Sequence, residues 1–158
     1  MASLDSFKHI KLTSFHQLNA HDFAPAGSLD RVLTFRNVHN WYMRGGEAGL
    51  DGAFSSFFKA LKQGGILGVV EHKLPESFND ETQKSSGYMK QSVVVAAAEK
   101  AGFKLVAESA VNLNPLDSSD HPKGVWTLLP SLRLGDTDRA KYLAIGESSR
   151  MTLKFVKP

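Results

Sequence analysis

Apolar residues first gather in a short run that predicts a buried strand. Residues 31–36 read RVLTFR, and the turn formers Pro25, Gly27 and Asp30 stand before them. A brief β-rich run behind such a boundary is typical of a strand inside a sheet. We therefore expect the first well-defined element of the fold here.

A helix is predicted next, because six apolar residues recur at helical spacing. They fall at i, i+3, i+4, i+7, i+8 and i+11 and form one stripe: Leu50, Ala53, Phe54, Phe57, Phe58 and Leu61. Such a stripe predicts a helix with one face in the core. Gly64 and Gly65 are typical of residues that end a helix. The polar, glycine-containing stretch over residues 36–49 predicts a turn before it.

The chain then continues to alternate strands and helices. Residues 66–70 read ILGVV, a continuous apolar run that favours a strand covered on both faces. A second helix is predicted over residues 87–101, with Gly102 as its end, and a strand over residues 103–109.

The C-terminal part predicts a long irregular segment and a last strand. Residues 111–149 are polar and contain several breakers, with a short helix near residues 136–142. Met151, Leu153 and Phe155 then alternate with their neighbours, as in a strand. Strand–helix–strand–helix–strand order with short links predicts parallel crossovers, and the last two strands predict an antiparallel pair. The predicted class is α/β: a Rossmann-like sheet of parallel strands, with helices on both faces and a C-terminal antiparallel strand.

The N-terminal residues have no clear period. LDSFKHI (4–10) favours a helix and KLTSFHQL (11–18) a strand. We interpret residues 1–28 as an arm of a single domain that spans residues 1–158, with residues 29–158 as its main body.

Composition narrows the classes of partner. The 19 basic and 16 acidic residues give a net charge of +3, and the basic residues are scattered. This distribution argues against nucleic acid and membrane surfaces as partners. The absence of cysteine excludes disulfides, thiolate metal sites and cysteine nucleophiles. No apolar stretch approaches the roughly 18 residues of a membrane span, and the N-terminus has no signal-peptide pattern. A soluble, cytoplasmic protein is expected.

Polar residues follow several predicted strands where each strand ends. Ligands of open parallel sheets bind outside the carboxyl ends of the strands. The candidates for ligand or substrate binding are Arg36, Asn37, Asn40, Trp41, Asn112, Asn114 and Arg150, and the catalytic candidates are His39, Glu71 and His72. We expect Asn37, His39, Trp41, His72 and Arg150 to line one concave surface under the loop over residues 111–149.

Each of these groups also has a purely structural interpretation. The RNVHNWY segment could be a polar turn that caps backbone groups. His72 could be a general base that Glu71 orients, or the two could form a simple surface pair. No metal site is expected. Asp117, Asp120 and His121 lie in a proline-flanked loop, where turn or capping roles are favoured over a metal site. Trp126 is interpreted as the residue that anchors this loop.

Four segments together resemble a known family. In order they read LDRVLTFRNVHNW (29–41), ALKQGGILGVVEHK (60–73), GYMKQSVVVAAAEKAGFKLV (87–106) and a closing RMTLKFVKP. They resemble the C-terminal half of class I S-adenosylmethionine-dependent methyltransferases, above all a bacterial group with an RNVHNW segment, an LKPGG turn and an ESDRMTL ending. The resemblance covers residues 29–158 and implies a truncated sheet that corresponds to strands four to seven of that fold. It also implies that Asn37, His39, Asn40 and Trp41 lie beside cofactor and substrate.

The cofactor-binding part of that family has no counterpart in this sequence. No two of the 13 glycines stand in G-x-G spacing. We therefore expect this chain alone to bind no cofactor, although the resemblance implies S-adenosylmethionine for the family. Three functions remain open: a non-catalytic small-molecule-binding or interaction module, an active methyltransferase completed by a partner chain or second subunit, and a truncated gene product.

The resemblance also implies a bare sheet edge. In the family's strand order, the strand at residues 31–36 lies beside a first strand that this sequence lacks. An uncovered strand edge is a template for association. We expect a homodimer that uses the N-terminal arm and this edge.

Overall fold

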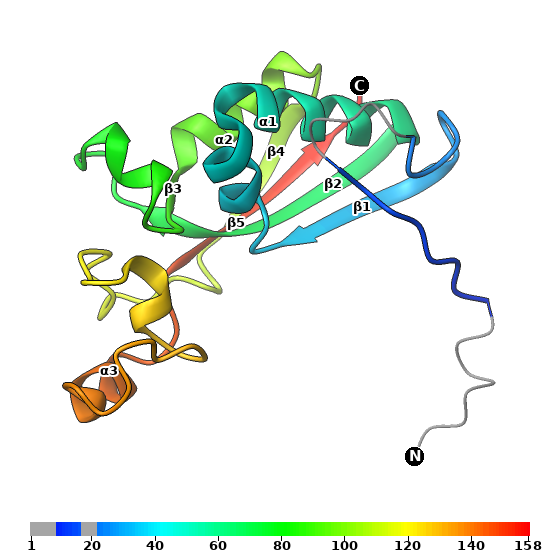
Figure 1. The fold of residues 1–158 in the computed structure, drawn as a ribbon. Helices are drawn as coiled ribbons and strands as arrows, with labels where there is room; N and C mark the ends of the chain where they lie inside the picture. The colour runs from blue at the N-terminus through cyan, green and yellow to red at the C-terminus, as the bar shows by residue number, and fades with distance from the viewer. Residues whose placement is uncertain (1–8, 17–21) are drawn as a thin grey trace.

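The computed structural model describes residues 9–16 and 22–158 of the chain. Its main sheet contains four strands in the spatial order β1 (Leu29–Phe35), β2 (Leu61–Leu74), β5 (Arg150–Val156) and β4 (Lys104–Ser109) (Figure 1). β1 is parallel to β2, and β5 is antiparallel to both β2 and β4. A short strand, β3 (Met89–Lys90), pairs with the end of β2. The α/β class and the C-terminal antiparallel pair are confirmed.

Two helices cover one face of this sheet (Figure 1). α1 (Val38–Ala60) connects β1 to β2, and α2 (Gln91–Lys100) precedes β4. The predicted apolar stripe supplies much of the core between α1 and the sheet: Leu50, Ala53, Phe54, Phe57 and Leu61 are buried, and Phe58 packs against them. Two 3₁₀ helices (Asp80–Lys84 and Gly124–Thr127) and α3 (Arg139–Ile145) lie in the connecting segments. No helix of the described residues is long and apolar enough to cross a membrane.

The first helix begins earlier than predicted. Residues 36–49 were expected to form a turn, but α1 starts at Val38 and only kinks at Gly46, where φ is +57°. Val38 and Trp41 are buried on the same side of this first part. A carboxylate from β2 also satisfies one of its free N–H groups, since Glu71 Oε2 accepts from the His39 N–H at 3.1 Å. The cap comes from a residue far away in sequence, so no local pattern indicates it.

Other boundaries also shift. β2 extends well beyond the predicted residues 66–70 in both directions. α2 begins at Gln91 rather than at residue 87, and α3 lies three residues later than the predicted short helix. Gly87 has a φ of +76°, and a side chain there would meet Val125 Cγ1 at 2.6 Å. The chain before α2 is therefore an extended segment packed against the later loop.

The second face of the sheet differs from the expectation of helices on both faces. In the part of the chain that the structure describes, α1 and α2 lie on the same face, and no helix covers the other. Leu33 and Phe35 of β1 are 60% and 58% exposed there, and Val106 of β4 is 52% exposed. α1 and α2 both pack on the opposite side, so an apolar face remains open among the described residues.

The arm is only partly described. Residues 10–16 form neither helix nor strand, so the predicted strand over residues 11–18 is wrong for that part, and its last two residues lie outside the described ranges. His9 and Ile10 are not helical, and the rest of the predicted helix over residues 4–10 lies outside the described residues. Phe15 stacks on Phe57 with ring centroids 5.3 Å apart and also contacts Trp41. This contact attaches the arm to α1 rather than to the edge of β1.

Candidate functional site

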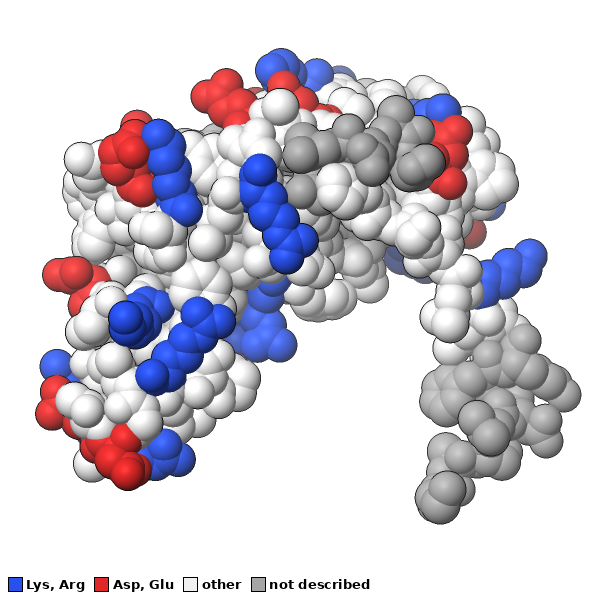
Figure 2. Space-filling view, in the orientation of Figure 1, with Lys and Arg blue, Asp and Glu red and all other residues white. Residues whose placement is uncertain are grey.

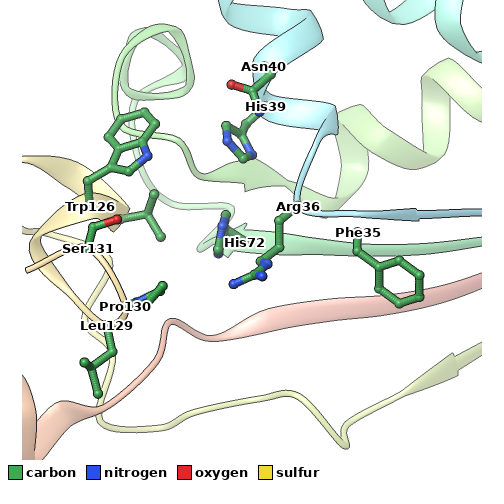
Figure 3. Close-up of a pocket in the computed structure, with 10 residues that line it drawn as sticks. Phe35, Arg36, His39, Asn40, His72, Trp126, Leu129, Pro130 and Ser131 are labelled. Carbon is green, nitrogen blue, oxygen red and sulfur yellow. The ribbon is translucent and has the colours of Figure 1, made fainter. Parts of the chain in front are cut away.

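A pocket lies at the carboxyl ends of β1 and β2. Its volume is about 300 Å³, and it lies between the start of α1 and the segment that contains the 3₁₀ helix Gly124–Thr127 (Figure 3). Its lining residues are Phe35, Arg36, His39, Asn40, His72, Val125, Trp126, Leu129, Pro130 and Ser131. A pocket therefore lies at the edge of the sheet where the sequence predicted a site.

Arg36 occupies an unusual backbone position at the end of β1. Its φ is +55°, a left-handed conformation that side chains with a Cβ rarely adopt. Its N–H donates to the Val70 carbonyl at 2.7 Å, which holds the turn against β2. The guanidinium extends into the pocket and forms no ion pair or hydrogen bond with the described residues. Strained residues with unused polar groups are typical of binding sites.

Glu71 fixes the position of His39. The Glu71 side chain is fully buried, and its carboxylate accepts from His39 Nδ1–H at 2.8 Å and from the His72 backbone N–H at 2.7 Å. A carboxylate only accepts hydrogen bonds, so Nδ1 of His39 is the donor in this bond and Nε2 takes no part in it. The prediction that Glu71 orients the ring of His72 is wrong, because the carboxylate bonds the ring of His39.

His72 lies beneath His39, with ring centroids 5.3 Å apart. Its Nδ1 is 2.5 Å from Ser148 Oγ. Burial lowers the pKa of His72 to about 4, and the positive charges of Arg150 and Arg36 act in the same direction, against Glu71. A buried imidazole with this pKa is neutral at physiological pH. His72 can therefore accept a proton or donate a lone pair, but it adds no charge to the pocket.

Trp126 forms the opposite wall of the pocket. Its ring lies 6.1 Å from that of His39, and the Arg133 guanidinium lies 4.6 Å from the centre of the Trp126 ring. Gly124 allows the segment to approach closely, since a Cβ there would meet the Ser86 carbonyl oxygen at 2.1 Å. The interpretation of Trp126 as a packing anchor is therefore incomplete. Trp126 packs against the cluster of Leu74, Tyr88 and Val125, and it also lines the pocket.

Only part of the predicted site comes together. Asn40 lines the pocket with Arg36, His39 and His72, whereas Asn37 and Trp41 are not among its lining residues. Trp41 is buried in the core, where its ring contacts Phe57. A tryptophan in a polar segment predicts a side chain that contacts a ligand. Because this segment is helical, Trp41 lies on the buried face of α1.

The remaining candidates lie away from this pocket. Asn112 donates to Thr152 Oγ1 at 2.8 Å, and Asn114 donates to the carbonyls of Ile145 and Glu147. Arg150 pairs with His72 across the two strands and forms an ion pair with Glu147. These three residues hold the loop to the sheet and do not line the pocket.

Asp117 organises the loop, as expected from its turn context. Its buried carboxylate accepts from the Tyr88 hydroxyl, from the Ser149 N–H at 2.7 Å and from His121 Nε2 at 2.8 Å. Burial raises the pKa of the Tyr88 phenol. Asp120 is exposed. Asp117 and His121 thus form a hydrogen-bonded support within the loop that carries the pocket wall, and Asp120 takes no part in it among the described contacts.

Sequence reasoning missed several lining residues. Phe35, Val125, Leu129, Pro130 and Ser131 line the pocket with the residues named above. Phe35 belongs to β1, where the strand pattern alone placed it in the sheet. The other four lie in the irregular segment. The density of apolar residues in VWTLLP (125–130) distinguishes Val125, Leu129 and Pro130 there, whereas nothing in the sequence distinguishes Ser131.

The residues of this pocket do not fit S-adenosylmethionine. The cofactor carries a positively charged sulfonium, and a ribose whose hydroxyls are commonly held by a carboxylate. The lining residues include one cation, Arg36, and no carboxylate. Glu71 is close by, but its oxygens are already bonded to His39 and to two backbone N–H groups. The pocket therefore offers no free carboxylate for the ribose hydroxyls of this cofactor.

Two solved structures, a methyltransferase and a cyclase, share the fold. A SAM-dependent methyltransferase from Methanosarcina mazei superimposes with a TM-score of 0.54 at 10% sequence identity, over 87% of this chain and 63% of that one. The [4+2]-cyclase SpnF superimposes with a TM-score of 0.52 at 17% identity, over 85% of this chain and 51% of that one. This chain therefore has a methyltransferase-like, Rossmann-like α/β fold. It spans less than two thirds of the length of either neighbour.

Identities this low establish the fold and not the reaction. No protein-family model matches the chain, and no curated protein sequence matches it significantly. The function must therefore be argued from the pocket.

Proposed function

We propose that this chain is a methyltransferase-like binding module whose pocket takes a small anionic ligand with an aromatic or apolar body. The observation that carries the proposal is the Arg36 guanidinium, which lies in the pocket without an ionic partner among the described residues. A planar guanidinium suits carboxylate and phosphate oxygens because it can donate two parallel hydrogen bonds.

The surroundings of Arg36 support the same ligand class. His39, His72 and Asn40 offer polar atoms on one wall, and Trp126 and Phe35 offer aromatic surface. On the face shown in Figure 2, basic side chains cross the middle, whereas acidic ones lie towards the margins. Pockets with a few convergent polar groups on an apolar lining are typical small-molecule sites.

The test uses benzoate as an anionic probe and benzamide as its neutral counterpart. Titration calorimetry should show binding of benzoate and weaker or no binding of benzamide. Arg36→Gln should weaken benzoate binding about tenfold or more, because a hydrogen bond to a charged group is worth about 1.5–3 kcal/mol. Arg31→Gln, on an exposed position of the same strand, is the control and should bind as the unaltered chain does. Equal affinity for both probes, or no effect of Arg36→Gln, would contradict the proposal.

The module is proposed not to bind S-adenosylmethionine on its own. The alternative is a methyltransferase whose cofactor site is completed by another polypeptide or a second subunit. The outer edge of β1, which has no strand partner in the described part of the chain, favours that alternative. Titration of the chain with S-adenosylmethionine and S-adenosylhomocysteine tests the binding-module proposal, and tight binding by the chain alone would refute it.

A homodimer through the N-terminal arm and the β1 edge is part of this proposal. The exposed apolar side chains beside that edge support it, since they would be covered by a second copy.

A further inference from the structure

The two histidines of the pocket are arranged as a pair of metal ligands would be. Around a tetrahedral Zn²⁺ with bonds of about 2.05 Å to nitrogen, two imidazole ring centres lie about 5.2 Å apart. The ring centroids of His39 and His72 are 5.3 Å apart, with planes tilted by 50°. One possible ligand atom from each histidine and one from Glu71 lie within 4.8 Å of one another.

The hydrogen bonds around the rings match the environment of metal-binding histidines. Such a histidine typically donates one ring N–H to a carboxylate or another fixed oxygen, which orients the other nitrogen towards the metal. His39 donates from Nδ1 to Glu71, and Nδ1 of His72 is bonded to Ser148 Oγ. Both rings are therefore held at Nδ1, and in each the atom available for a ligand is Nε2.

Glu71 acts as the support of this pair and not as a third ligand. Its carboxylate already accepts from two backbone N–H groups and from His39. It also balances charge at the site. The positive charges of Arg36 and Arg150 act on His72. The negative charge of Glu71 opposes them, and Glu147 forms an ion pair with Arg150. The sum of these four formal charges is zero, so a cation at the site meets no net repulsion from them.

We propose that Nε2 of His39 and Nε2 of His72 bind one first-row transition-metal dication of the zinc, cobalt, nickel or copper class, with Glu71 and Ser148 as positioning residues. Imidazole ligands select these ions, whereas Mg²⁺ and Ca²⁺ prefer oxygen. Both histidines line the pocket, so the remaining coordination positions would be open to water or to a ligand. This proposal does not depend on the anion-binding proposal.

The experiment uses the full chain after treatment with a chelator and dialysis. Zn²⁺ titration should show one equivalent of bound ion, and Co²⁺ should give visible absorption bands with the same stoichiometry. His39→Ala and His72→Ala should each weaken Zn²⁺ binding about tenfold or more, and Glu71→Gln about 10–100-fold, as for other supports of metal ligands. Mg²⁺ should not compete. His9→Ala, at an exposed histidine, is the matched control and should bind like the unaltered chain.

A second measurement needs no variant. In long-range ¹H–¹⁵N spectra of the unaltered chain, Zn²⁺ should shift the Nε2 resonances of His39 and His72 and of no other histidine. Shifts confined to other histidines, binding that survives in both single variants, or no binding by the unaltered chain would each overturn the proposal. If a variant fails to fold by circular dichroism, the spectra of the unaltered chain decide.

Discussion

At the scale of single residues, Glu71 links the two halves of the pocket. It caps the start of α1 through the His39 N–H, holds the His39 ring, and bonds the backbone of His72. One buried carboxylate thus sets the position of both histidines. The EH pair at the end of β2 was recognised in the sequence, but its partner was not, because that partner lies 32 positions earlier on α1.

His72 should make the metal-free chain less stable in mild acid. Its pKa is about 4 in the fold and about 6.5 when unfolded, so the unfolded state takes up the proton first. Its contribution to the free energy of unfolding is complete above pH 6.5 and falls as the pH drops towards 4. The loss between pH 7 and pH 5 should be about 2 kcal/mol.

Urea unfolding at both pH values, with chelator present, measures this loss. His72→Gln should remove about 2 kcal/mol of the pH dependence, and His9→Gln should leave it unchanged. The same dependence in the His72→Gln chain would show that other groups cause it.

At the scale of elements, β1 carries a polar group that its surroundings do not satisfy. Thr34 is buried on the helix-covered face, and its hydroxyl has no hydrogen-bond partner. Thr34→Val keeps the shape and removes the unmet hydroxyl, so the free energy of unfolding should rise by about 1 kcal/mol or more. Thr152→Val on β5 is the contrasting variant: its hydroxyl accepts from Asn112 at 2.8 Å, and its loss should lower stability. Chemical denaturation compares the two, and destabilisation by Thr34→Val would refute the argument.

The elements themselves were largely predictable where a local period exists. The stripe from Leu50 to Leu61 and the alternation from Met151 to Phe155 both reflect burial on one face. Such burial gives a regular spacing of apolar residues that can be seen in the sequence. The start of α1 and the wall around Trp126 depend on contacts with Glu71 and Gly87, which lie far away in sequence. Long-range contacts of this kind leave no period in the sequence.

At the scale of the whole molecule, the open face of the sheet and the outer edge of β1 are where the proposed dimer would form. Leu33 projects over Gly68 on that face, where a Cβ would lie 2.7 Å from its side chain. If two copies pair there, Leu33→Lys should convert a dimer to a monomer because it adds a charge to the buried contact. Leu143→Lys, at an exposed leucine of α3, is the control. Light scattering after size exclusion measures the mass, and a monomeric unaltered chain would refute the dimer.

The position of β5 determines when the molecule can fold during its synthesis. β5 lies between β2 and β4 and joins them, yet it is the last of the strands to be made. Until residues 150–156 have left the ribosome, β4 has no neighbour in the main sheet and β2 lacks one of its two. The earlier strands therefore keep unpaired backbone groups until β5 is available. Pairing between strands far apart in sequence is also slow. A chain stalled before Arg150 should be a substrate for chaperones, whereas a chain in which residues 150–156 are free to pair can complete its sheet.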